Sequence, residues 1–219
     1  MADQSKPAEP PATLQISHFI LPAGTLLHRV HQGRFGPTEY NPTGGGNARF
    51  SPIATAAGPI VPTLYAGSTF HCAVMETAFH DVSYSPGLKT FQQKRLNGLK
   101  HSVIHTTQEL TLVDLSSKAL RRLGIQRQHL IDTPASEYGY TRSWAQAIHQ
   151  FAPEVQGLRW VSRQDDQAVA FLLFGDRVSE SALIEHDVGR DLQHDPDTFA
   201  QMLALAELIG VLLIPEEEP

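Results

Sequence analysis

The first half of the chain predicts short strands separated by turns. Residues 14–21 form an apolar segment, and residues 25–31 alternate apolar and polar side chains, as a strand with one buried face does. Further strands are expected over 47–53, 63–67, 102–105 and 110–115. Residues 33–46 are rich in glycine, proline and threonine, so we expect a loop there.

One helix in this half has a recognisable apolar face. It is predicted to begin after Ser68, as N-cap, and to run to about Asp81. Its apolar stripe recurs at spacings of three and four residues and consists of Phe70, Ala73, Val74, Thr77 and Ala78. Glu76 lies off the centre of this stripe. The carboxylate can therefore point into a cleft while the helix stays packed.

The second half of the chain mixes helices and strands without regular alternation. Helices are predicted over 116–123, over 136–151 and from Asp195-Pro196 to about 207, because caps and helix-stop residues flank these segments. Strands are predicted over 157–162 and 168–174, joined by a polar turn, and over 210–214. This order predicts an α+β fold, in which a single domain over 14–214 contains mainly antiparallel sheets.

The two ends of the chain have a different composition from the middle. Residues 1–13 are polar and proline-rich and are expected to be disordered, and residues 215–219 form an acidic tail. The extension over 179–219 contains an amphipathic helix with Phe199, Met202, Leu203 and Ala206 on one side. We expect this helix to pack on the core, and a dimer contact is the alternative.

Composition excludes several classes of protein. Among 219 residues, 17 are Lys or Arg and 23 are Asp or Glu, and the net charge of −6 argues against a protein that binds nucleic acid by neutralising phosphates. No apolar run reaches the ~18 residues of a membrane helix. The single cysteine, Cys72, excludes an intrachain disulfide and a cysteine zinc cluster. With no export signal, a cytoplasmic location is expected.

Candidate ligands for a metal are numerous but poorly spaced. The chain has 11 histidines and no H-E-x-x-H motif, and His28 and His31 would face opposite sides of a strand. We therefore expect no metal. The glycines at 44–46 could hold a phosphate through backbone N–H groups, and Arg49, which follows closely, strengthens that interpretation.

Four segments with residues of catalytic type follow one another along the chain. They are LLHRV with Arg29, GGGNARFSP with Arg49, LYAGSTFHCAVMETAFHDV with Tyr65 and Glu76, and YTRSWAQAIHQFAPEVQGLRWVSRQDDQAVAFLLFGD with Ser162. This order resembles the RES domain family, which is named after its arginine, glutamate and serine. The resemblance covers about residues 26–176.

The resemblance implies a fold, an activity and partners. The fold would be similar to that of diphtheria-toxin-like ADP-ribosyltransferases. The activity would be that of a toxin that cleaves the nicotinamide–ribose bond of NAD and passes ADP-ribose to phosphate, water or a protein. NAD would be a substrate, with no bound cofactor or metal. The implied partner is an antitoxin with a helix-turn-helix (Xre-like) domain, with no direct contact to nucleic acid or membrane and with a homodimer left open.

The same resemblance assigns roles that fit the chemistry of NAD cleavage. Glu76 would stabilise the positive charge that develops on the ribose, while Arg29 and Arg49 would bind the diphosphate. Ser162 would hydrogen-bond the ribose or amide and brace the glutamate, so Glu76, Ser162 and Arg29 are the expected catalytic residues. Tyr65 would stack on nicotinamide.

One position departs from the family pattern. Many members have an aromatic residue directly after the first arginine, where this chain has Val30. The stacking surface must then come from elsewhere, with Tyr65 as the candidate. The substitution also favours the main alternative, a non-catalytic module that binds NAD or another nucleotide. A third, weaker interpretation is a hydrolase that uses a histidine with Asp165 and Asp166, although a solvated turn accounts better for that pair.

Overall fold

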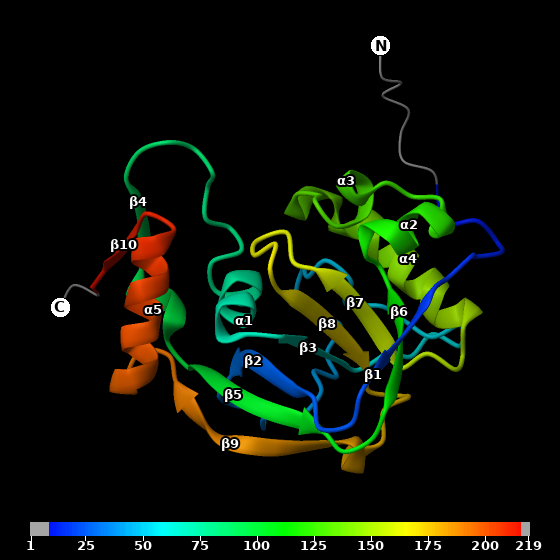
Figure 1. Cartoon of the computed structure of the whole chain (residues 1–219), viewed down its shortest axis with the longest axis horizontal. Helices are drawn as coiled ribbons and strands as arrows, with labels where there is room; N and C mark the ends of the chain where they lie inside the picture. Colours follow the sequence, from blue (N-terminus) through cyan, green and yellow to red (C-terminus); the bar gives the residue numbers. More distant parts are fainter. Residues whose placement is uncertain (1–8, 216–219) are drawn as a thin grey trace.

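A curled sheet of eight strands organises the protein, in the order β1-β6-β7-β8-β3-β2-β5-β9 (Figure 1). The structure, a computed structural model, describes residues 9–215. All neighbouring strands in this sheet are antiparallel except β6 and β7. The strands are β1 (His18–Leu21), β2 (Leu26–Gln32), β3 (Thr63–Gly67), β5 (Leu99–Thr106), β6 (Leu110–Asp114), β7 (Gly157–Val161), β8 (Val169–Phe174) and β9 (Leu183–Asp191). The predicted α+β class, with one domain and a mainly antiparallel sheet, is confirmed.

The helices form two groups. α1 (Phe70–Thr77) contacts β2, β3 and β8. Four residues of the predicted apolar stripe are buried, whereas Thr77 is only partly buried and lines a cavity. The other group lies near β6 and β7 and contains α2 (Ser117–Leu123), α3 (Arg127–Leu130) and α4 (Tyr138–Phe151) (Figure 1). Single 3-10 turns occupy Gln93–Leu96, Ala135–Glu137 and Glu180–Ala182.

The carboxy-terminal extension packs on the core. α5 (Pro196–Leu208) begins at Asp195, whose side chain accepts from the Thr198 N–H, and β10 (Val211–Ile214) pairs in parallel with β4 (Lys89–Gln92). Met202 and Ala206 are buried in one cluster with residues of α1. Leu203, which was predicted to share their face, is 46% exposed because it points away from that cluster.

Three local predictions are wrong. Residues 47–53 form no strand, because Pro52 has no N–H and the backbone is bonded elsewhere: Ala48 N–H to the Ser51 carbonyl, and Phe50 N–H to the Tyr65 hydroxyl. Thr69, not Ser68, caps α1, since its hydroxyl accepts from the Cys72 N–H. The same helix ends at Thr77 rather than near residue 81. The strands β4 and β9 were not predicted.

The predicted tails lie largely outside the described residues. Residues 1–8 and 216–219 are in that category, and residues 9–13 form no helix or strand. Leu14 is the first buried residue in the described part. No helix within residues 9–215 has the length and apolar character needed to cross a membrane.

Candidate functional site

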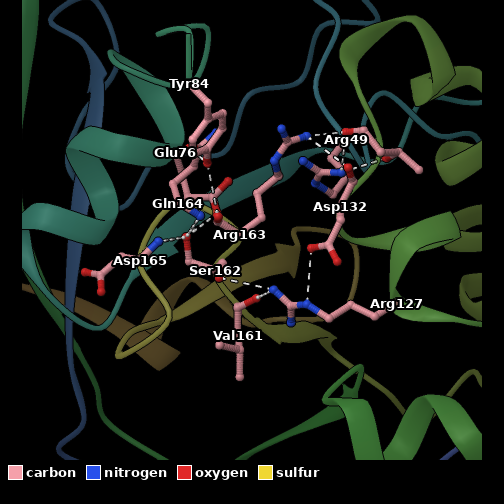
Figure 2. Close-up of polar contacts among 11 residues, drawn as sticks. Arg49, Glu76, Tyr84, Arg127, Asp132, Val161, Ser162, Arg163, Gln164 and Asp165 are labelled. Atoms are coloured by element: carbon pink, nitrogen blue, oxygen red, sulfur yellow. Dashed lines mark hydrogen bonds and ion pairs between the residues drawn. The ribbon is translucent and has the colours of Figure 1, made fainter. Parts of the chain in front are cut away.

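A cavity of about 640 Å³ opens where β2, β3 and α1 meet the loop before β3 and the start of α4. Its volume falls in the ~300–1,000 Å³ range of small-molecule sites. Arg29, Arg49, Tyr65 and Glu76 all line it. The fifth candidate, Ser162, lies directly behind Glu76 (Figure 2). The fold thus brings together the five residues that the sequence placed in one site.

The Glu76 carboxylate enters the cavity from the last turn of α1. The buried residues of that helix include Ala73 and Val74, whose packing fixes the helix against the sheet and leaves Glu76 at the edge of the contact. Its Oε1 accepts a 2.6 Å hydrogen bond from the Ser162 hydroxyl. Its Oε2 receives no hydrogen bond from any described residue, so one carboxylate oxygen is available to a ligand.

The Ser162 hydroxyl is fully used within the protein. It donates to Glu76 and accepts from the backbone N–H groups of Gln164, at 3.0 Å, and Asp165, at 3.1 Å. A serine hydroxyl offers one donor and two acceptor positions, so none remains for a ribose. The side chain is completely buried just after β7. In this arrangement Ser162 braces Glu76, and a direct contact to the ribose would require one of these bonds to break.

Two further groups fix the strand end that carries Ser162. The Arg127 guanidinium donates to the carbonyl oxygens of Val161 and Ser162, at 3.2 and 3.3 Å, and forms an ion pair with Asp132 at 3.1 Å. Figure 2 shows this arginine on the far side of Ser162 from Glu76. The end of β7 is therefore held from both sides.

The Arg49 guanidinium is buried and bonded only to neutral oxygens. Its Nη1 donates to the hydroxyl of Thr133, at 2.8 Å, and to the carbonyl of the same residue, at 3.2 Å. Its Nη2 donates to the Tyr138 hydroxyl, and the guanidinium lies over the Tyr138 ring, 5.0 Å from the centroid. Burial lowers the pKa of Arg49, and the more distant charge of Glu76 is among the groups that oppose this shift.

Arg29, which also lines the cavity, has a comparable environment. It is 4% exposed, and its Nη1 donates to the carbonyl oxygens of Gly36 and Pro37, at 3.1 and 2.6 Å. Burial lowers its pKa to about 10, and the nearby Tyr40 and Glu39 oppose this shift. Neither Arg29 nor Arg49 forms an ion pair with a carboxylate in the described part of the chain. Buried positive charge without a paired anion is unfavourable, so the cavity favours an anionic ligand.

The Tyr65 side chain combines a structural hydroxyl with a ring that lines the cavity. The hydroxyl accepts from the Phe50 N–H at 3.0 Å, next to Arg49. Burial raises its pKa to about 12, so the hydroxyl stays neutral. The ring lies edge-on to Trp160 with centroids 6.2 Å apart, and it is half-buried. Val30, by contrast, is 7% exposed and packs with Phe70 in the core, although its edge reaches the cavity.

Sequence reasoning missed three residues of this site. Thr133 and Tyr138 hold Arg49, and Arg163 donates to the Thr133 carbonyl at 2.5 Å. No local signal identifies Thr133 or Tyr138, because their contacts join segments more than 80 residues apart.

The structure also shows the surroundings of the other residues that the sequence analysis considered for a site. His28 forms a 3.0 Å contact between its Nδ1 and the Nε2 of His101, and no group of three His, Cys, Asp or Glu residues suited to a metal occurs within residues 9–215. Asp165 accepts from the Gln167 N–H in a turn and has no described histidine partner. Burial raises the pKa of Cys72 to about 12, which keeps the thiol protonated. Two of the three consecutive glycines, Gly45 and Gly46, do line the cavity.

A family model matches this chain. The model of the RES domain matches residues 26–195, which is most of the chain and includes every residue of the site described above. A search of curated proteins finds no match. The RES domain is toxin-associated and NAD-related at the family level, and it is associated with toxin–antitoxin systems. The match extends about twenty residues beyond the resemblance seen in the sequence, and it shows that this chain belongs to the RES domain family.

Proposed function

We propose that this chain is a toxin-like enzyme that cleaves the nicotinamide–ribose bond of NAD. The observation that carries the proposal is the sign of the charges around one cavity. Arg29 and Arg49 are buried there without paired carboxylates, and the carboxylate of Glu76 faces the same space. NAD offers the complement, because it has two negative phosphates and a sugar that becomes positive when nicotinamide leaves.

The arginines would bind the diphosphate. Each keeps N–H groups that the described residues do not use, since Arg29 bonds through Nη1 alone and Arg49 through three of its five N–H groups. An anion between them would offset the cost of burying both charges.

Glu76 would act on the sugar. A carboxylate beside the anomeric carbon stabilises the oxocarbenium-like transition state more than the ground state, which is the requirement for a higher rate. The bond from Ser162 fixes Oε1, so the orientation of the carboxylate is set before the substrate binds. Tyr65 and Tyr138, whose rings line the cavity, would offer aromatic surface to the nicotinamide or adenine base.

Four further points belong to the proposal: the fold type, the place of action, the inhibiting partner and the acceptor of ADP-ribose. We propose a fold of the diphtheria-toxin-like ADP-ribosyltransferase type, action in the cytoplasm, and inhibition by an antitoxin with a helix-turn-helix domain. ADP-ribose would pass to phosphate, to water or to a protein side chain.

Release of free nicotinamide tests the proposal. The purified chain is incubated with NAD in phosphate-free buffer, in phosphate buffer and with added protein from a cell extract. Nicotinamide release is expected in at least one arm, and the arm identifies the acceptor. Binding of NAD without release in any arm would favour the alternative of a non-catalytic nucleotide-binding module. A folded protein that neither binds nor cleaves NAD would overturn both.

A further inference from the structure

Thr133 connects two arginines that come from distant parts of the chain. Arg49 donates to its hydroxyl at 2.8 Å and to its carbonyl at 3.2 Å. Arg163 donates to the same carbonyl oxygen at 2.5 Å. Two positive groups thus meet at one oxygen, and the Arg163 charge is among the causes that lower the pKa of Arg49.

The segment that carries Thr133 is itself held firmly. The Asp132 side chain forms an ion pair with Arg127, whose guanidinium also binds the backbone at Ser162 (Figure 2). Thr133 is 5% exposed, so its hydroxyl has a defined direction. The contacts therefore tie the arginine side of the cavity to the strand end that braces Glu76.

Neither Arg49 nor Arg163 forms an ion pair with a carboxylate in the described part of the chain. Two such guanidinium groups repel each other, and each has a long side chain that could swing apart. The shared carbonyl, together with the Thr133 hydroxyl, holds them close in spite of this repulsion. Of the two, Arg49 lines the cavity, so a diphosphate that binds there meets a guanidinium that is already oriented.

We propose that Thr133 is a positioning residue for the binding of an organic diphosphate, and that it acts through Arg49. The inference rests on the proposed function for its ligand class, and it adds a residue that contacts no ligand directly. Its hydroxyl fixes the direction of the Arg49 guanidinium, while its carbonyl sets the distance between Arg49 and Arg163.

The test compares Thr133→Val with Thr133→Ser by titration calorimetry. ADP-ribose is the probe, and adenosine, which has no diphosphate, is the control ligand. Valine keeps the shape and removes the hydroxyl, so affinity for ADP-ribose should fall about tenfold, the effect of losing one hydrogen bond to a charged group. Serine keeps the hydroxyl and should restore the affinity to within about twofold. Adenosine affinity should be the same in all three proteins.

A second substitution controls for general loosening of the fold. Thr106 is a buried threonine that bonds to the Pro22 carbonyl, and it lies outside the cavity. Thr106→Val should lower the melting temperature and leave ADP-ribose affinity unchanged.

The outcomes separate this inference from the proposed function. Equal ADP-ribose affinity in folded Thr133→Val and wild type would overturn the inference, whatever the protein does with NAD. Equal weakening of adenosine and ADP-ribose would also overturn it, because the effect would then not act through the diphosphate. Tenfold weakening in a protein that never releases nicotinamide would support the inference and contradict the proposed function. A folded wild type that binds no ADP-ribose would overturn the inference, whereas nicotinamide release still decides the proposed function.

Discussion

Ser162 and Glu76 are 86 positions apart in sequence and are joined by a 2.6 Å hydrogen bond at the edge of the cavity. The serine is completely buried and the glutamate is half-buried, so the bond links the protein interior to the ligand space. Because the other bonding positions of the hydroxyl are occupied by two backbone N–H groups, its direction is fixed. The glutamate therefore has one constrained oxygen and one oxygen free to meet a substrate.

Ser162→Ala should reduce turnover and spare the affinity for NAD. Loss of a hydrogen bond to a charged group costs roughly 1.5–3 kcal/mol, which corresponds to about a ten- to hundred-fold fall in kcat if the bond orients Glu76 in the transition state. Steady-state kinetics give kcat, and calorimetry on a slow variant gives Kd.

Ser68→Ala is the matched control for this change. Ser68 also accepts from a backbone N–H, that of Val169, and it lies outside the cavity. Its loss should affect stability alone. A large rise in Kd for Ser162→Ala would show instead that the serine contacts the substrate.

Arg49→Ala should weaken NAD binding more than it weakens the fold. The change removes a charge-assisted contact to phosphate, worth roughly 1.5–3 kcal/mol or about ten- to hundred-fold in affinity. Arg177→Ala is a suitable comparison, because Arg177 also bonds to backbone carbonyls, those of Ala152 and Val155, far from the cavity. It should destabilise the protein without changing Kd. Equal NAD affinity with and without the Arg49 guanidinium would remove this residue from the site.

The sequence predicts those elements that depend on neighbouring residues, and it does not predict those that depend on contacts between distant segments. Alternation over residues 25–31 and the helix start at Asp195-Pro196 are local, and the structure has β2 and α5 at those positions. Residues 47–53 show where local reasoning fails. Their pattern suits a strand, but the Phe50 N–H bonds to the Tyr65 hydroxyl, and the N–H of Ala54, which follows the segment, bonds to the Gln146 side chain. No residue near them in sequence indicates these partners.

The candidate site shows the same limit. Resemblance located Glu76 and Ser162, because the segments that carry them have recognisable neighbours. It did not indicate Thr133, whose contact with Arg49 spans 84 positions and exists only after the chain has folded. Nor did it show that Ser162 has no bonding position left for a ribose, since that depends on two backbone N–H groups.

Stability should fall on acidification in part through His101. Burial, together with the neighbouring His28, lowers the pKa of His101 to about 4, from an ordinary value of 6.5. The unfolded chain takes up a proton in this interval that the folded chain does not. Stability contributed by this group is therefore present above pH 6.5 and is lost as the pH falls toward 4, with a size of about 1–2 kcal/mol between pH 7 and pH 5.

Urea unfolding of wild type and His101→Gln near pH 7 and near pH 5 measures this contribution. Glutamine can still bond to His28 and does not titrate, so the variant should lose about 1–2 kcal/mol less than wild type over the interval. Histidines that do not interact with His101 affect both proteins alike and cancel in the comparison. An equal loss in the two proteins would contradict the prediction.

The change that tests the mechanism most directly is Glu76→Gln. Glutamine keeps the size of the side chain and its helix propensity, and its amide can still accept from Ser162, so folding and NAD affinity should stay within about twofold of wild type. The negative charge that faces the cationic sugar is lost, and removal of one such preorganised group typically lowers kcat by ~10²–10³. Nicotinamide release under saturating NAD measures this effect.

Glu207→Gln, on the exposed side of α5, makes the same chemical change away from the cavity and should leave the rate unaltered. If Glu76 were only a solvated helix residue, its substitution would resemble that control, since surface changes stay within roughly 0.5 kcal/mol. Turnover near the wild-type rate in the Glu76 variant would therefore refute the proposed role of the carboxylate, even though the family assignment would stand.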